Sequence, residues 1–253
     1  MRDYQLRPMD CFLDAKNSAC IWLQCSPSEE WPYFSRIWNS APIRVCCDDP
    51  ANGMASRVRA CALEPPSIVC ECSGSLQEAN ANYYSEHNSR LVHCHDQCKP
   101  SLEKCFDAIE GALRKHTVKR VVVLGGLSSR LDRAIGTIHS LMKAEHVFRM
   151  PIYILDGDRM AFTLYQGDYH LRLDREMLTK YCGLAPLAQR RTNVTTEGFR
   201  WNLEGSELSM GGLVSSSNEI ARDELRVSTT APLLMTMQLA SHGREGRRMR
   251  SRM

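Results

Sequence analysis

Arg120-Val-Val-Val-Leu-Gly-Gly-Leu-Ser-Ser-Arg-Leu-Asp-Arg133 is the stretch of sequence that indicates the fold most clearly. Its first five residues form an apolar run typical of a buried strand, the glycine pair turns the chain, and helical periodicity follows over residues 131–144. A second apolar run at 151–155 predicts the next strand. A strand, a glycine turn and a helix in this order favour a parallel sheet with a ligand site at the carboxyl end of the strand.

The preceding residues repeat this alternation of strands and helices. The sequence predicts strands at 19–25, 43–47, 68–70 and 90–93, and helices at 31–39, 76–86 and 102–115. Strands that alternate with helices of this length are typical of a parallel sheet with crossover helices. The first half is therefore predicted to be an α/β domain.

After residue 156 the pattern changes to short segments separated by Gly, Asp, Asn or Ser. Strands are predicted at 159–165, 169–173, 181–186, 191–195, 199–203 and 208–215. Such spacing favours an antiparallel sandwich or barrel. We therefore expect a boundary near 156–158, with an α/β domain at 19–156, an all-β domain at 157–241, an N-terminal extension at 1–18 and a basic tail at 242–253.

The composition excludes several classes of protein. Hydrophobic residues make up 43% of the chain, and 32 basic against 29 acidic residues give a net charge of +3, which does not require a nucleic-acid partner. No segment has the apolar length of a membrane span or the block of a signal peptide. Eleven of the 12 cysteines precede residue 106, which favours reduced thiols over a secreted disulfide framework. A cytoplasmic protein without nucleic-acid or membrane partners is expected.

The glycine turn carries the first candidate functional residues. Gly125 and Gly126 permit a close backbone approach, and Arg130 and Asp132 could hold a phosphate and a metal or hydroxyl. An ordinary strand-to-helix turn with a surface Arg–Asp pair is the alternative.

Motifs in both halves resemble the thiamine pyrophosphokinase family from about Cys20 to Ala240. In the first half, the residues at 125–132 are similar to the family motif Gly-Gly-x-x-x-Arg-x-Asp, and Asp48-Asp-Pro-Ala-Asn52 resembles its nucleotide loop Asp-Gly-Gly-Ala-Asn. In the second half, the resemblance lies in Tyr181-Cys-Gly-Leu-Ala-Pro186, Val194-Thr-Thr-Glu-Gly-Phe-Arg-Trp-Asn-Leu203, Gly212-Leu-Val-Ser-Ser-Ser-Asn218 and Pro232-Leu-Leu-Met-Thr-Met237.

The resemblance implies a Rossmann-like N-terminal domain, a C-terminal antiparallel β-sandwich and a homodimer with thiamine bound between subunits. It implies transfer of pyrophosphate from ATP to the thiamine hydroxyl, with Mg²⁺ as cofactor and AMP as the second product. The implied site residues are Arg130 and Asp132 for catalysis, Asp48, Asn52, Gln97, Gly125 and Gly126 for ATP, and Trp201, Ser217 and Asn218 for thiamine.

The chain departs from the family at the carboxylates that face the metal. The family motif Gly-Asp-x-Asp-Ser corresponds to Glu71-Cys-Ser-Gly-Ser75, so Cys72 and Gly74 stand where carboxylates are expected, and Cys98 and Ser101 replace others. Mg²⁺ prefers oxygen ligands. These replacements raise a second hypothesis, that the chain is a catalytically impaired thiamine-binding paralogue, either a pseudoenzyme or the dimer partner of an intact subunit.

Two further patterns leave their alternatives open. Cys70-Glu-Cys72 and His93-Cys-His-Asp-Gln-Cys98 supply thiol and imidazole ligands that suit Zn²⁺, but buried cysteine is commonly a small apolar residue. The indole of Trp201 could stack on a cationic heterocycle or pack in the sandwich core, and the serines before Asn218 could simply form a turn.

Overall fold

The computed structural model describes residues 2–23, 32–96, 98–128, 130–144, 147–188 and 190–240. The described chain divides into two compact units, which we describe separately. The first unit comprises residues 14–157, and the second combines residues 2–13 with 158–240. Residues 242–253, the predicted basic tail, lie outside the described residues.

The first unit is built on six parallel strands, as the alternating pattern predicts. Their order across the sheet is β7-β6-β2-β3-β4-β5. The strands are β2 (Ser18–Trp22), β3 (Ile43–Cys47), β4 (Ile68–Glu71), β5 (Arg90–His93), β6 (Arg120–Leu124) and β7 (Ile152–Asp156). Every residue of β2, β6 and β7 is buried, because helices cover both faces of a parallel sheet.

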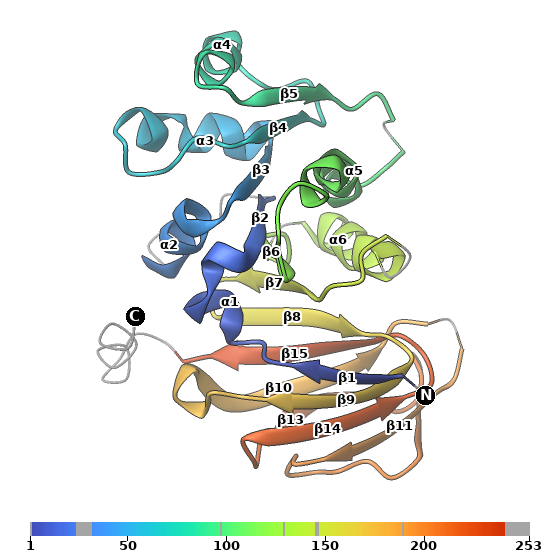
Figure 1. Ribbon diagram of the computed structural model, residues 1–253. Helices are drawn as coiled ribbons and strands as arrows, with labels where there is room; N and C mark the ends of the chain where they lie inside the picture. Colours follow the sequence, from blue (N-terminus) through green and yellow to red (C-terminus); the bar gives the residue numbers. More distant parts are fainter. Residues whose placement is uncertain are drawn as a thin grey trace. The chain divides into compact units, whose positions relative to one another are not determined.

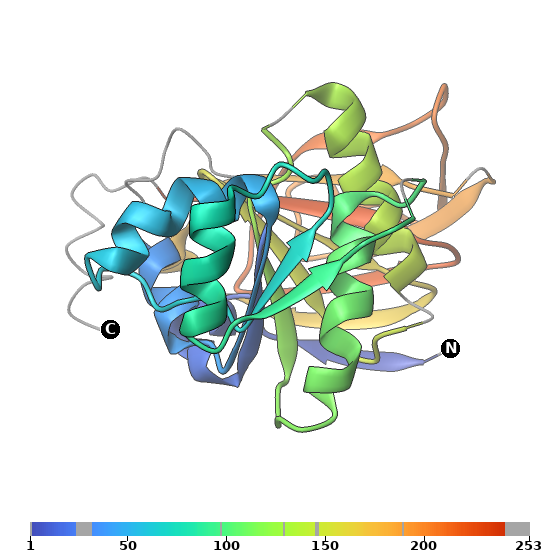
Figure 2. The same cartoon turned by 90° about the horizontal axis from the view of Figure 1, so that it is seen from above.

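The helices lie in two layers. In Figures 1 and 2, α3 and α4 cover one face of the sheet, whereas α5 and α6 cover the other. The helices are α2 (Pro32–Ser40), α3 (Asp48–Arg59), α4 (Glu78–Glu86), α5 (Ser101–Leu113) and α6 (Leu131–Ala144), and a short 3₁₀ turn η1 (Ala15–Asn17) precedes β2. The sheet grows from β2 through β3 and β4 to β5 and then continues with β6 on the other side of β2, so the later helices cover the opposite face of the sheet. The adjacent strands β2 and β6 therefore form a switch point.

The second unit is all-β apart from single short turns. One sheet has the order β1-β9-β14-β11-β12, and β13-β10-β15-β8 form an antiparallel set. The elements are β1 (Asp3–Leu6), α1 (Asp10–Leu13), β8 (Arg159–Leu164), β9 (Gly167–Arg172), η2 (Arg175–Met177), β10 (Leu178–Pro186), β11 (Thr192–Glu197), β12 (Ser206–Leu208), β13 (Ser215–Glu219), β14 (Glu224–Thr229) and β15 (Leu233–Leu239). The predicted fold class, α/β followed by an antiparallel β-sandwich, is confirmed.

The first residues form part of this second unit, whereas the sequence assigned 1–18 to an extension. β1 pairs in parallel with β9, so that Tyr4 stands opposite Tyr169. Their rings stack with centroids 4.6 Å apart. A Cβ atom on Gly167 would lie 2.6 Å from the Tyr4 ring, so only glycine admits this contact. The partner of β1 lies more than 160 residues away in sequence, which local pattern cannot reveal.

Two predicted strands of the second half are wrong. Residues 199–203 form a turn, because the Phe199 backbone N–H donates to the Asn202 side chain at 3.1 Å, and only Phe199 makes an isolated bridge. The predicted strand 208–215 is interrupted by a turn in which the Gly212 N–H donates to the Ser209 carbonyl at 3.0 Å. In both cases a side chain or a glycine closes a turn inside an apolar run.

Helix α3 is an element that the sequence analysis missed, since its start was assigned to a nucleotide loop. Asp48 and Asp49 occupy its first turn, and Arg57 and Arg59 its last, as the helix dipole favours. Pro50 is tolerated because amides of the first turn have no partner within the helix.

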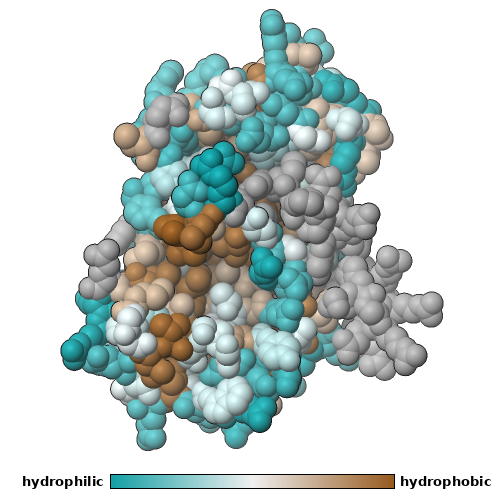
Figure 3. Space-filling model, turned by 180° about the vertical axis from the view of Figure 1, so that it is seen from behind, coloured by the Kyte–Doolittle hydropathy of each residue, from teal (hydrophilic) through white to brown (hydrophobic). Residues whose placement is uncertain are grey.

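No helix among the described residues is long and apolar enough to cross a membrane. Some apolar side chains are nevertheless exposed, and Figure 3 shows brown patches on one side of the surface. Leu131 and Ile135, one turn apart on α6, are 77% and 58% exposed, and Met210 and Leu213 are exposed in the second unit. Exposed apolar side chains that are neighbours, such as Leu131 and Ile135, are typical of an interaction site.

Candidate functional site

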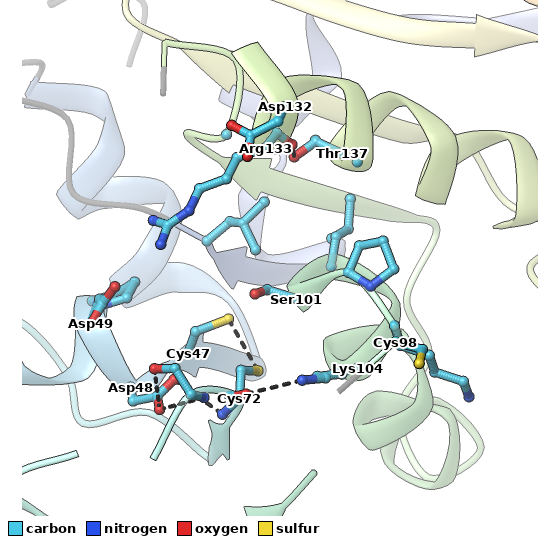
Figure 4. Close-up of a pocket in the computed structure, with 18 residues that line it drawn as sticks. Cys47, Asp48, Asp49, Cys72, Cys98, Ser101, Lys104, Asp132, Arg133 and Thr137 are labelled. Atoms are coloured by element: carbon cyan, nitrogen blue, oxygen red, sulfur yellow. Dashed lines mark hydrogen bonds between the residues drawn. The ribbon is translucent and has the colours of Figure 1, made fainter. Parts of the chain in front are cut away.

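A cavity of about 400 Å³ opens at the carboxyl ends of the parallel strands in the first unit. Leu23 after β2, Cys47 at the end of β3, Cys72 after β4 and Gly126 after β6 contribute to its walls. It therefore spans the switch point between β2 and β6, which is where α/β sheets bind ligands. Figure 4 shows its side chains.

Three helices begin at this cavity. Its lining includes Asp48 to Pro50 of α3, Ser101 of α5, and Asp132 and Arg133 of α6, all within the first turns of their helices. The unpaired amides and the dipole make a helix N-terminus favourable for anions. The charged side chains of the lining are balanced, with three carboxylates, Asp48, Asp49 and Asp132, and three cations, Lys99, Lys104 and Arg133.

Asp48, expected to contact ATP, is buried at the cavity wall and binds the chain that follows β4. Its Oδ1 accepts the Cys72 N–H at 3.1 Å, and its Oδ2 accepts the N–H and Oγ–H of Ser73 at 2.9 Å each and the Ser75 N–H at 3.1 Å. Burial raises the pKa of Asp48, but these hydrogen bonds outweigh it and lower the pKa below its usual value. Asp48 is thus an ionised carboxylate whose two oxygens fix the cavity wall.

The glycine pair shapes the opposite wall. Gly125 and Gly126 have positive φ angles of 80° and 102°, and the Leu127 and Ser128 amides of the following turn donate to the Asp156 carboxylate, each at 2.6 Å. Gly126 lines the cavity, and a Cβ atom there would lie 2.7 Å from Leu23 Cδ2. The glycine is needed for both its conformation and its close packing.

Arg130 and Asp132, the expected catalytic pair, face each other at the start of α6. The guanidinium donates to both carboxylate oxygens, at 3.2 and 2.9 Å, and both side chains are exposed. The Arg130 hydrogen bond holds the pKa of Asp132 below its usual value. Asp132 lines the cavity.

Two other residues, Asn52 and Gln97, are expected at the ATP site. Asn52 is outside the lining of the cavity, and its amide supports the loop to α4 by donating to the Ser75 carbonyl at 2.8 Å and accepting the Gln77 N–H at 3.0 Å. Gln97 lies outside the described residues.

Lys104 and Arg133 are lining residues that the sequence analysis did not single out. Lys104, although buried, has its Nζ 3.0 Å from the Cys72 carbonyl at the floor of the cavity. Arg133 extends from α6 into the cavity (Figure 4). Its place beside Asp132 in the glycine motif could have indicated Arg133, whereas Lys104 lies in an amphipathic helix with no local signal.

The expected thiamine residues lie in the second unit. Trp201 is 51% exposed, so it is not a core residue, and the Arg200 guanidinium lies 4.7 Å from its ring centroid. The buried Asn218 accepts the Trp201 N–H at 3.3 Å and donates to the Trp201 carbonyl at 2.8 Å. Asn218 therefore fixes the backbone that carries the indole, while Ser217 is exposed on β13.

Known protein families match both units. The model for "Thiamin pyrophosphokinase, catalytic domain" matches residues 34–154, and the model for "Thiamin pyrophosphokinase, vitamin B1 binding domain" matches residues 168–234. The chain belongs to the thiamine pyrophosphokinase family.

Individual thiamine pyrophosphokinases are similar over most of the chain. Thiamin pyrophosphokinase 1 of Caenorhabditis elegans is 29% identical, covering 93% of this chain and 95% of the relative, and thiamine pyrophosphokinase 3 of Oryza sativa is 30% identical, covering 85% and 86%. The solved structure of yeast thiamin pyrophosphokinase shares the fold, with a TM-score of 0.80 at 18% identity over 93% and 91% of the two chains.

The described residues do not fit a protein-bound Mg²⁺ of the kind the family resemblance implies. Cys72 and Ser101 line the cavity where carboxylates are expected, and Gly74 stands at another such position. Both carboxylate oxygens of Asp48 already accept hydrogen bonds from backbone amides and a hydroxyl. Among the described residues, no group of three or more His, Cys, Asp or Glu side chains is arranged to hold a metal ion. Thiols and a hydroxyl are poor replacements for the oxygen ligands of Mg²⁺.

The Cys and His residues of the possible zinc pattern are divided between two environments. His93 is exposed and pairs through Nδ1 with the Glu71 carboxylate, and Cys98 is also exposed. Cys72 is buried instead and contacts the Cys47 thiol, with the two sulfurs 3.8 Å apart. None of the eleven cysteines that the structure describes forms a disulfide.

Proposed function

We propose that this chain is a thiamine pyrophosphokinase that transfers the pyrophosphoryl group of ATP to the hydroxyl of thiamine. The hydroxyl oxygen bonds to the β-phosphorus, the bond from that phosphorus to the α–β bridging oxygen breaks, and AMP leaves with its electron pair. The hydroxyl proton is released. The observation that carries the proposal is the match of both family models, one to each unit.

We assign the triphosphate of ATP to the cavity of the first unit. The N-termini of α3, α5 and α6 and the Lys104 and Arg133 side chains supply partial and full positive charge there. Such groups favour polyphosphate and stabilise the charge that develops on the transferred group. Gly126 lines the cavity without a side chain, so phosphate oxygens can approach its backbone.

Arg130 and Asp132 are assigned to the reacting groups. The lowered pKa of Asp132 keeps its carboxylate ionised at neutral pH, so it can accept a hydrogen bond from the thiamine hydroxyl and orient the oxygen. Arg130, which forms a forked hydrogen bond with Asp132, can turn to a phosphate oxygen when ATP binds.

Thiamine is assigned to Trp201, Ser217 and Asn218. An exposed indole face suits a cationic ring, and Asn218 holds the indole by its backbone. Arg200 lies over the same ring, so the incoming thiazolium must displace this guanidinium or use the opposite face.

A homodimer with thiamine between subunits is part of the proposal. The apolar side chains of Leu131 and Ile135 on α6 offer surface for a second copy. Light scattering is expected to give twice the chain mass, and a strict monomer would contradict this part.

A cytoplasmic location also belongs to the proposal. The absence of disulfides among the eleven described cysteines suits a reducing compartment. Cell fractionation followed by detection of the full-length protein tests this location.

No step is assigned to Mg²⁺, because no group of three or more His, Cys, Asp or Glu side chains in the described part of the chain is arranged to hold a metal ion. The same observation favours a second candidate function, a thiamine-binding paralogue with impaired turnover. Loss of about 3 kcal/mol of transition-state stabilisation for each carboxylate corresponds to roughly a hundredfold in rate. The two candidates share the fold and differ in turnover.

The deciding experiment measures AMP and thiamine diphosphate formed by the full-length protein with ATP, thiamine and Mg²⁺. The quadruple variant Cys72→Asp, Gly74→Asp, Cys98→Asp, Ser101→Asp is the matched control. Similar turnover by both proteins supports the proposed enzyme. Turnover at least a hundredfold higher in the variant supports the impaired paralogue. Absence of products from both, together with absence of thiamine binding by calorimetry, contradicts both functions.

A further inference from the structure

Thiols from separate elements meet at the floor of the cavity, and they include Cys47, Cys72 and Cys105. Cys47 ends β3, Cys72 follows β4 and Cys105 lies in α5. The Cys47 and Cys105 sulfurs are 3.4 Å apart, and the Cys47 and Cys72 sulfurs are 3.8 Å apart. A disulfide requires about 2.0 Å between the sulfurs. Cys47 thus contacts two thiols that modest side-chain rotation could bring to bonding distance.

Access distinguishes the two contacts. Cys47 and Cys72 line the cavity and are 4% and 6% exposed, so a small solute in the cavity reaches them (Figure 4). Cys105 is completely buried and is not part of the cavity lining. A small oxidant that enters the cavity therefore meets the Cys47–Cys72 pair before it meets Cys105.

The surroundings favour Cys72 as the thiolate of this pair. Hydrogen bonds with the Cys105 and Cys47 thiols lower the pKa of Cys72 to about 4, and the nearby Lys104 ammonium acts in the same direction. The hydrogen bond with Cys105 lowers the pKa of Cys47, but that with Cys72 and burial outweigh it and raise the value, so Cys47 keeps its proton. The thiolate is the form that reacts with oxidants.

We propose that Cys47 and Cys72 form an oxidisable dithiol that a peroxide converts into a disulfide at the floor of the cavity. The Cys72 thiolate attacks one peroxide oxygen, the O–O bond breaks, and the leaving hydroxide takes up a proton, which leaves Cys72 as a sulfenic acid. The Cys47 sulfur then bonds to the Cys72 sulfur, the S–O bond breaks, and a second water leaves with the Cys47 proton. In sum, two thiols and hydrogen peroxide give one disulfide and two waters.

The bridge would act on the wall of the cavity. The backbone N–H of Cys72 donates to Asp48, the residue directly after Cys47, and its carbonyl accepts from Lys104. A covalent bond between the ends of β3 and β4 would therefore fix the positions of the Cys72 backbone, the Asp48 carboxylate and the Lys104 ammonium. This modification site is independent of whether the chain turns over thiamine.

The test uses the full-length protein, reduced, freed of reductant and treated with hydrogen peroxide. Non-reducing peptide mapping is expected to find Cys47 linked to Cys72, and the intact mass to fall by two hydrogens. Cys72→Ala and Cys47→Ala should each lose at least nine-tenths of the linked peptide. Cys182→Ala is the matched control, because it removes a buried thiol of the second unit and should retain the link.

Other outcomes overturn the proposal. They are a link between Cys47 and Cys105 in the parent protein, a link between Cys72 and the neighbouring Cys94, or oxidation confined to the exposed Cys61 and Cys98 while Cys47 and Cys72 stay reduced. The mapping of the parent protein decides the question without any variant, so a variant that does not fold leaves the result intact.

Discussion

Replacement of Asp48 by alanine tests whether this carboxylate is a structural residue of the cavity wall. Four hydrogen bonds from Cys72, Ser73 and Ser75 end on its two oxygens. The substitution removes all four acceptor contacts while leaving every donor in place. Asp48 is one of three carboxylates that line the cavity, so its role limits the number of oxygens that are available to a metal.

The magnitude follows from the environment of each donor. Cys72 is buried, so its N–H loses its partner without access to water, which costs about 1–3 kcal/mol. Ser73 and Ser75 are exposed, so water replaces the carboxylate for their three donors, and each lost bond costs about 0.5 kcal/mol. The sum is a loss of about 2.5–4.5 kcal/mol in the free energy of unfolding.

Urea unfolding followed by circular dichroism measures this loss. Asp49→Ala is the matched control, because the neighbouring Asp49 is exposed and its carboxylate accepts a hydrogen bond from the exposed Ser75 hydroxyl at 2.8 Å. A loss below about 0.5 kcal/mol is expected for this control. Equal effects of the two substitutions would refute the structural role of Asp48.

The dependence on pH gives an independent check. The folded-state pKa of Asp48 is lowered, so its contribution is present above the unfolded value of about 3.9 and is lost as the pH falls through the folded value. The stability difference between the parent and Asp48→Asn should therefore be largest above about pH 5 and should shrink below pH 4. A difference that stays constant over this range contradicts the assignment.

Three further predictions concern separate parts of the chain. Gly126→Ala should destabilise the protein by about 2 kcal/mol in urea unfolding, because Gly126 has a positive φ and packs closely against Leu23. Its control, Gly111→Ala on the open face of α5, should stabilise the protein by about 0.5 kcal/mol, and equal effects of the two substitutions would contradict this reasoning. Trp201→Ala should weaken thiamine binding at least tenfold in calorimetry and Trp201→Phe much less, and an unchanged affinity in the alanine variant would exclude the stacking role. Elemental analysis of protein purified without chelator should find well under one zinc per chain, and stoichiometric zinc lost in Cys72→Ser would show that a soft-metal site exists.

The first unit could be predicted largely from sequence because its signals are local. The apolar run 120–124 and the helix 131–144 agree with β6 and α6, since a parallel strand covered on both faces is apolar at every position. The glycine turn between them is equally local, because positive φ angles at two successive residues require glycine. Helix α3 was missed although acidic and basic residues mark its two ends, because its first residues also matched a nucleotide loop.

The second unit shows the limit of the same reasoning. The strand pattern predicted its all-β class, but the turn after Gly198 and the pairing of β1 with β9 depend on contacts with distant segments. Trp201 shows this directly, since sequence offers both a core position and an exposed one. The backbone of the turn that carries the exposed Trp201 is held by hydrogen bonds with Asn218, which lies on β13.

The sequence by itself determined the class of the two units, the family and the loss of carboxylates at Cys72, Gly74 and Ser101, because residue type and spacing carry this information. The tertiary structure alone decided how the remaining groups are used. It directs both Asp48 oxygens to the loop after β4, brings Lys104 under the cavity and places the Cys47, Cys72 and Cys105 thiols in contact. These contacts join β3, β4 and α5, whose distances in space follow from the order of strands in the sheet and not from their distances along the chain.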